Sequence, residues 1–115
     1  MQTHKIINKT KNITVLDKVV LADTFFSRLK GLMGKKALDK GEGIIIKPCS
    51  SIHSFGMKMA IDVAFIDKDN QVIFILENFK PKKMSPIIKG SKYVIETSAN
   101  LFQDKLDVKD IIEVI

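Results

Sequence analysis

The 115-residue sequence has little of several residues on which common functions depend. It contains one cysteine, one tyrosine, one arginine, two histidines and no tryptophan. A single cysteine cannot close an internal disulfide, and zinc sites usually take more Cys and His ligands than this chain supplies. We therefore expect no bound metal, no cofactor and a reducing compartment, the cytoplasm.

The sequence has no long apolar run. Each of its apolar runs is far shorter than the roughly 20 residues with which a helix crosses a bilayer. The N-terminal stretch MQTHKIINKTKN lacks the apolar centre of a secretory signal. The composition, 45% hydrophobic and 28% charged, is typical of a single globular domain covering residues 1–115. We expect no membrane partner.

The net charge of +6 raises the question of nucleic-acid binding. The lysines are spread along the chain, with acids such as Asp67, Asp69 and Asp104 among them. A single arginine and a single tyrosine supply little bidentate base readout or base stacking. We expect no specific nucleic-acid partner, and weak non-specific attraction at most.

Apolar and β-branched segments bounded by turn residues predict a mainly-β protein. The expected strands are residues 3–8, 13–22, 43–47, 59–66, 71–79, 92–97 and 110–115. One amphipathic helix is expected near the N-terminus, capped by Asp23, ended by Gly34 and packed into the core through Phe25, Leu29, Leu32 and Met33. This pattern predicts an α+β fold, mainly β, with an antiparallel sheet curled into a sandwich or barrel.

Two acids stand where these strands should be apolar. Asp62 lies between Ala60 and Ala64 on its own side of a strand, and Glu96 lies in the strand at residues 92–97. Such acids cost folding free energy unless they are paired. Together with His53 they form a candidate cluster for ligand binding or general acid–base chemistry. The simpler interpretation is that backbone N–H groups satisfy each one separately.

Cys49 is four residues before His53, and this spacing suggests two interpretations, a catalytic thiol–imidazole pair or half of a metal site. If the segment is extended, the two residues lie about 13 Å apart and cannot touch. A half-buried structural thiol is therefore favoured. The segment 80–91, which holds two of the three prolines, is expected to be a long loop and a candidate lid over the site.

The pattern C-x-S-I-H-S-F-x-M-x-M-x-I-D-V-x-F-x-D at residues 49–67, with Gly31-Leu32-Met33 and the 93–96 segment YVIE, resembles the DUF192 or UPF0127 family of uncharacterised proteins. The resemblance implies a compact, mostly β domain whose motifs line one cleft, bringing Met57 together with His53, Asp62 and Glu96. The chain departs from the family where it has Ala60 in place of proline, Met59 in place of an aromatic, and Lys109-Asp110 in place of Gly-Asp.

We predict that the domain binds a small molecule or peptide in a cleft lined by His53, Met57, Asp62 and Glu96. The alternative is a small enzyme in which His53 acts with Asp62 or Glu96 in acid–base chemistry, and a third class is a structural partner in a complex. Asp62 is expected to be partly unpaired, so that Asp62→Asn leaves stability intact. The sequence does not identify the ligand, a reaction or an oligomeric state.

Overall fold

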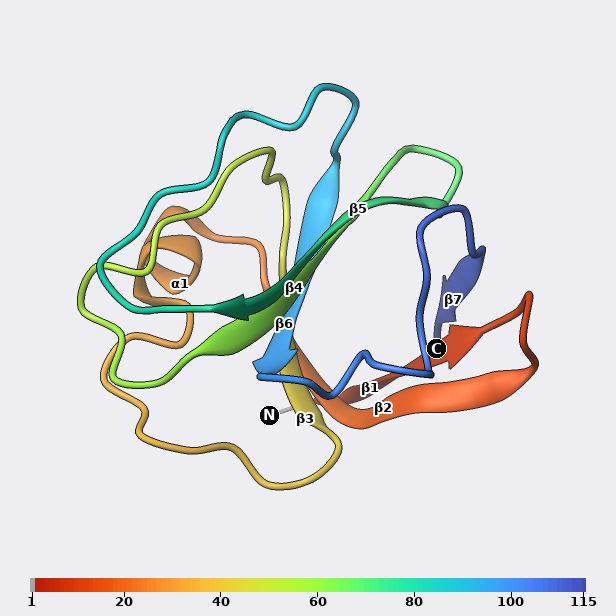
Figure 1. Cartoon of the computed structure of the whole chain (residues 1–115), viewed down its shortest axis with the longest axis horizontal. Helices are drawn as coiled ribbons and strands as arrows, with labels where there is room; N and C mark the ends of the chain where they lie inside the picture. The colour runs from red at the N-terminus through yellow and green to blue at the C-terminus, as the bar shows by residue number, and fades with distance from the viewer. Residues whose placement is uncertain (1) are drawn as a thin grey trace.

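The computed structural model describes residues 2–115, except for the side chain of Phe25. Seven strands form one sheet in the order β5-β4-β6-β3-β2-β1-β7 (Figure 1). The mainly-β fold with one short helix is confirmed. The elements are β1 (His4–Asn8), β2 (Ile13–Ala22), α1 (Phe25–Lys30), β3 (Glu42–Ile46), β4 (Ile61–Ile66), β5 (Val72–Phe79), β6 (Tyr93–Ser98) and β7 (Ile112–Val114).

Neighbouring strands are antiparallel with one exception, because β2 and β3 run parallel. The connection between them contains α1, so the chain crosses from one end of β2 back to the start of β3. Parallel neighbours need such a crossover, whereas antiparallel neighbours can be joined by a short turn. The predicted antiparallel sheet therefore contains one parallel pair. The crossover places α1 over one face of the sheet (Figure 1).

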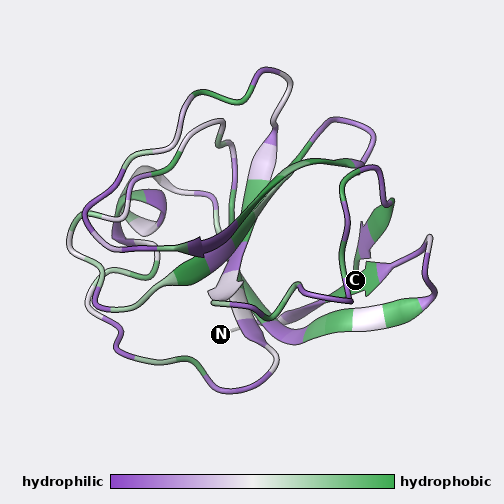
Figure 2. Cartoon of the chain, viewed as in Figure 1, coloured by the Kyte–Doolittle hydropathy of each residue, from purple (hydrophilic) through white to green (hydrophobic). Residues whose placement is uncertain are grey.

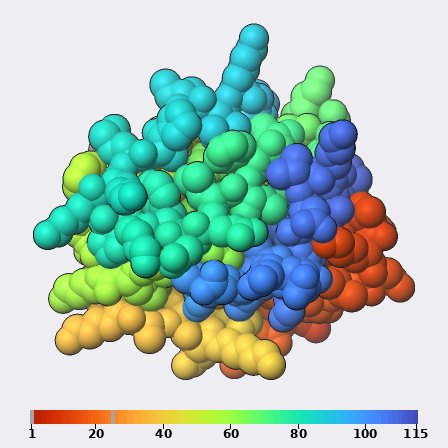
Figure 3. Space-filling view, in the orientation of Figure 1, coloured from red at the N-terminus to blue at the C-terminus, as the bar shows by residue number. Residues whose placement is uncertain are grey.

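The sheet curls until its two ends nearly meet. Gln71, just before β5, forms a bridge with Ile111, just before β7. The N–H of Val72 donates to the carbonyl of Asp110 at 2.9 Å, and the N–H of Lys109 donates to the carbonyl of Val72 at 2.7 Å. In the space-filling view the C-terminal segment, in blue, lies between the green β5 region and the red first hairpin (Figure 3).

Two apolar clusters lie on opposite faces of the sheet. The inner core, inside the curl, includes Leu16, Ile95, Phe102 and Ile112, and the outer core, beneath α1 and the long loops, includes Leu32, Ile44, Met57, Val63 and Val94. Strands β3, β4 and β6 contribute alternate residues to the two cores, so they are apolar on both sides. Figure 2 shows hydrophobic residues along these crossing strands and hydrophilic ones in the outer turns.

The helix is shorter than the sequence pattern predicts. Its N-cap is Thr24, whose side chain and that of Ser27 form a reciprocal capping box, so the assignment of Asp23 as the cap is wrong. It ends at Gly31, which has φ +44°. Leu32 packs in the outer core, whereas Leu29 and Met33 are exposed, contrary to the expected core face. The predicted contribution of Phe25 lies outside the described residues.

The segment between β5 and β6 is a fixed wall of the fold. Residues 82–88 run antiparallel to residues 50–54, with N–H groups of Ser54, Ser85 and Ile88 bonded to carbonyls across the pair. The Ser54 hydroxyl adds a bond to the Lys80 carbonyl at 2.6 Å. These bonds favour a fixed wall of the fold over the expected movable lid.

Within residues 2–115, no helix has both the length and the apolar character needed to cross a membrane.

Candidate functional site

A pocket of about 580 Å³ opens between α1 and the sheet, on the outer-core side. The end of α1 and the turn after it form one wall, and the segment 48–53 forms another. The floor includes Ile46 at the end of β3 and Glu96 on β6. Leu29 and Met33, which lie on either side of the helix end at Gly31, border this hollow.

Glu96 has the most unusual environment in this pocket. It lies in the middle of β6, opposite Ile44 of β3 and Val63 of β4, and is only 3% exposed. Among the described residues, no hydrogen bond or ion pair involves its carboxyl group. Burial raises the pKa of Glu96 from its ordinary value of 4.5 to about 7. The pocket floor therefore carries a carboxyl group that is divided between its two protonation states near neutral pH.

Cys49 lines the same pocket and is half-buried. Its Sγ lies 3.1 Å from the carbonyl oxygen of Ser51, to which the thiol donates. Burial, and the charge of Glu96 nearby, raise the pKa of the Cys49 thiol, while the guanidinium of Arg28 acts in the opposite direction. A thiol with a raised pKa is a weak nucleophile at neutral pH. This environment favours the structural interpretation of Cys49.

His53 and Met57 also line the pocket, at different depths. Met57 is buried in the outer core, whereas His53 is exposed at the rim. The backbone of His53 forms a bridge with Met84, and its ring stacks on Phe55 with 5.8 Å between the ring centroids. Three of the four predicted ligand-binding residues therefore share one pocket.

Asp62, the fourth, does not lie in this pocket. It is fully buried in β4, where one carboxylate oxygen accepts the N–H groups of Asn78 and Asn100 at 2.9 Å. The other oxygen accepts the N–H of Phe102 at 3.1 Å. The expectations that Asp62 shares the cleft and is partly unpaired are both wrong. Three backbone donors hold this carboxylate within the scaffold.

Strand register separates the two acids. In the β4–β6 pair, Asp62 lies opposite Thr97 and Glu96 lies opposite Val63. Residues directly opposite each other point to the same face of a sheet, and successive residues along a strand point to opposite faces. Asp62 and Thr97 therefore face the inner core, whereas Val63 and Glu96 face the outer core and the pocket.

Sequence reasoning missed other parts of the site. Arg28 and Lys30, which are not part of the predicted core face of the helix, line the pocket together with Lys92 and the small side chains of Ser50, Ser51 and Ser91. Gly31 is the signal that could have indicated an early end of the helix, because a glycine allows the chain to leave the helix at that position.

Among residues 2–115, no group of three His, Cys, Asp or Glu side chains is placed to hold a metal ion.

A second hollow, of about 320 Å³, lies on the other face of the sheet around Tyr93 and Lys47. Three of its polar side chains, those of Lys47, Asn70 and Tyr93, already have partners. The Tyr93 hydroxyl donates to Asn70 Oδ1 at 2.8 Å, and Lys47 Nζ lies 5.4 Å from the centroid of the Tyr93 ring. The pocket at Glu96 is therefore the stronger candidate.

These features define a small, mainly-β domain with one pocket under its only helix, as far as residues 2–115 show. A sequence profile of DUF192, described as "Uncharacterized ACR", matches residues 5–114, and the chain belongs to this family. It is 33% identical over 115 residues to a UPF0127 protein of Pyrococcus abyssi, covering 94% of this chain and 95% of the relative.

A UPF0127 protein of Thermococcus sibiricus is 36% identical over 96 residues, which cover 80% of this chain and 62% of the relative. The match thus spans less than two thirds of that protein's length. A crystal structure of a protein of unknown function from Novosphingobium aromaticivorans has a TM-score of 0.83 and 21% identity, covering 96% of this chain and 82% of that one. At this identity the likeness shows a shared fold.

Proposed function

We propose that this domain binds a small molecule or a peptide side chain in the pocket under α1, with Glu96 as the group that selects it. The observation that carries the proposal is that Glu96, a residue only 3% exposed, lines a pocket of about 580 Å³ while its carboxyl group has no protein partner among the described residues. Burying such a group costs free energy, and a hydrogen-bond donor on a ligand would offset that cost.

The remaining lining indicates the kind of ligand. Leu32, Ile46 and Met57 supply apolar surface near the floor, whereas Arg28 and Lys92 bring positive charge. Small-molecule sites commonly combine a mostly apolar wall with a few polar groups that fix orientation. The fitting ligand has an apolar body and presents an amine or hydroxyl group to Glu96. His53 and Met57 would contact its outer and inner parts.

The test is a binding screen by ligand-observed NMR with a library of primary amines, alcohols and dipeptides. We expect binders that lose at least about tenfold in affinity, roughly 1.4 kcal/mol, in the Glu96→Gln protein. The matched control is Glu77→Gln, the same chemical change at an exposed position on β5. Amines should also bind more tightly as the pH rises through about 7, because the carboxylate then predominates. Hits that bind both variants equally would contradict a role for Glu96.

A second candidate function is acid–base catalysis by Glu96, the alternative in which His53 serves as the partner group. The observation in its favour is the pKa of about 7, since general acids and bases work best when their pKa is close to the working pH. Each confirmed binder would be incubated with the protein and recovered for mass spectrometry. Conversion that disappears in Glu96→Gln favours an enzyme, and binders recovered unchanged after hours favour a binding protein.

We place this function in the cytoplasm. The support is the single cysteine, a free and half-buried thiol that needs no oxidising environment to complete the fold.

A further inference from the structure

The fold gathers positive charge around the pocket. Apart from Glu96, every residue that lines the pocket belongs to residues 24–38, 43–61 or 78–95, which we call the framing segments. These segments contain eleven of the nineteen Lys and Arg residues and none of the thirteen Asp and Glu residues. The rest of the chain therefore has eight cations and thirteen acids. Arg28, Lys30 and Lys92 line the pocket itself, whereas Lys47 borders the hollow on the other face of the sheet.

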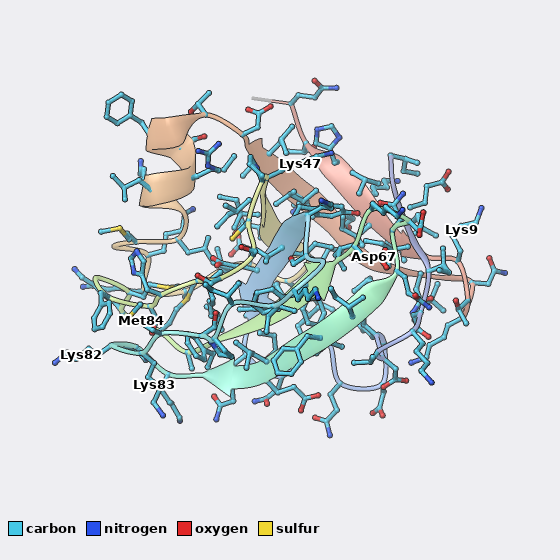
Figure 4. All side chains as sticks on the ribbon, turned by 90° about the horizontal axis from the view of Figure 1, so that it is seen from above. Lys9, Lys47, Asp67, Lys82, Lys83 and Met84 are labelled. Carbon is cyan, nitrogen blue, oxygen red and sulfur yellow. The ribbon has the colours of Figure 1, made fainter. Side chains whose placement is uncertain are left out.

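Exposed apolar side chains lie in the same segments. The most exposed large hydrophobic residues among those described are Phe26, Met84 and Ile87, each at least 70% exposed, and all belong to the framing segments. Met84 is bridged to His53 at the pocket rim, and the neighbouring Ile88 N–H donates to the Ser50 carbonyl. Figure 4 shows Lys82, Lys83 and Met84 projecting from the end of the molecule that carries α1, with Lys9 at the far end.

We propose that this basic and apolar face docks an acidic, apolar segment of a partner protein, with the pocket in the middle of the interface. An excess of positive charge attracts an anionic partner and steers its approach. Exposed methionine and isoleucine side chains add apolar area that a purely ionic partner would leave in water. An extended segment of about ten residues, at roughly 3.3 Å each, spans the 34 Å length of the molecule.

Two other anionic partners fit the face less well. Base-specific readout and base stacking rely largely on arginine and aromatic side chains, and the chain has one arginine and one tyrosine. A flat lipid surface would leave the central pocket unfilled, whereas a peptide side chain can enter it. The proposal depends on the surface outside the pocket, so it can fail while Glu96 still binds a small molecule, and the reverse also holds.

The probes are three fluorescein-labelled twelve-residue peptides. The first alternates Glu or Asp with Leu or Phe, the second replaces its apolar residues with Ser, and the third replaces its acids with Lys. By fluorescence anisotropy, we expect only the first to bind, and its affinity to fall several-fold between ~50 and ~200 mM salt. Lys82→Glu/Lys83→Glu should weaken this binding at least tenfold, and Met84→Ser/Ile87→Ser should also weaken it.

The matched control is Lys5→Glu/Lys68→Glu, which changes the net charge equally at two exposed lysines outside the framing segments. This protein should bind the first peptide nearly as well as the unmodified chain. Equal losses in both charge variants, or no binding of the first peptide, would overturn the proposal. So would a stronger interaction of the basic face with duplex DNA or phosphatidylglycerol vesicles, or self-association that requires Lys82 and Lys83.

Discussion

Glu96 and Asp62 show how two buried acids on neighbouring strands can have opposite effects on the stability of the fold. Asp62 accepts three backbone N–H groups, so its burial is compensated within the protein. Glu96 has no such donors among the described residues and faces a pocket. A buried carboxyl group without donors is ionised only at a cost, which raises its pKa. Its unfavourable position is the reason for which we propose a ligand-binding role for Glu96.

This cost predicts a pH dependence of stability. The pKa of Glu96 rises from 4.5 in the unfolded chain to about 7 in the folded one, so the folded state holds the extra proton between these values. Stability should therefore fall as the pH rises through this window, by about 3 kcal/mol in all. Glu96→Gln removes the titration. Its melting temperature should match the original near pH 4 and exceed it by roughly 10 °C at pH 8.

Thermal denaturation followed by circular dichroism across pH 4–8 measures this difference, and Glu77→Gln serves as the exposed control. A difference between the Glu96→Gln and original proteins that does not change with pH would show that the pKa of Glu96 is the same in the folded and unfolded chain.

At the scale of elements, Asp62 connects three pieces of the fold. Its carboxylate reaches Asn78 near the end of β5, where the β4–β5 register shifts, and Asn100 and Phe102 in the turn after β6. Asn78 and Asn100 both have positive φ, a conformation that asparagine tolerates better than most residues. The carboxylate therefore fixes two irregular segments against the middle of the sheet.

Asp62→Asn should destabilise the protein, in contrast to the expectation from the sequence alone. The amide replaces one accepting oxygen with a donor that faces backbone donors. A loss on the order of 2–3 kcal/mol is expected, or roughly 10 °C in melting temperature. Asp69→Asn, in an exposed turn, should change stability by less than about 0.5 kcal/mol. An unchanged melting temperature for Asp62→Asn would show that the Asp62 carboxylate does not stabilise the fold.

At the scale of the whole molecule, closure of the curled sheet depends on the C-terminal segment. The backbone bonds between Val72 and residues 109–110 join the two ends of the sheet. Ile112 then packs into the inner core at 2% exposure, while its neighbour Ile111 faces outward at 38%. Because Ile112 belongs to the same inner core as residues of β1, β2 and β6, loss of this contact should affect the whole domain.

The two isoleucines provide a matched pair. Ile112→Ala should lower the free energy of unfolding by about 3 kcal/mol, as expected for a cavity in a packed core. Ile111→Ala should lower it by less than about 1 kcal/mol. Urea denaturation followed by far-UV circular dichroism is the appropriate measurement, because the chain has no tryptophan. Similar losses in the two variants would mean that β7 contributes to the sheet mainly through its backbone.

The sequence by itself determined the elements. The alternation of apolar and polar residues and the turn residues act locally. The seven strands therefore lie close to their expected positions, and β2 lies at the expected residues 13–22. The turn between β4 and β5 is equally local, since the Asp67 side chain accepts the N–H groups of Asp69 and Gln71. The mainly-β class followed from these short-range patterns, and the resemblance to the family followed from the motifs at residues 31–33, 49–67 and 93–96.

Only the tertiary structure decided which of these residues share a site. Alternation shows which residues share a face within one strand, but a one-residue shift between two strands exchanges the faces. The observed β4–β6 register places Asp62 inside the curl and Glu96 in the pocket. The parallel β2–β3 pair and the placement of Arg28, Lys30 and Lys92 around one pocket also depend on contacts between residues distant in sequence. Such contacts depend on the connections and register between strands, which no local sequence pattern specifies.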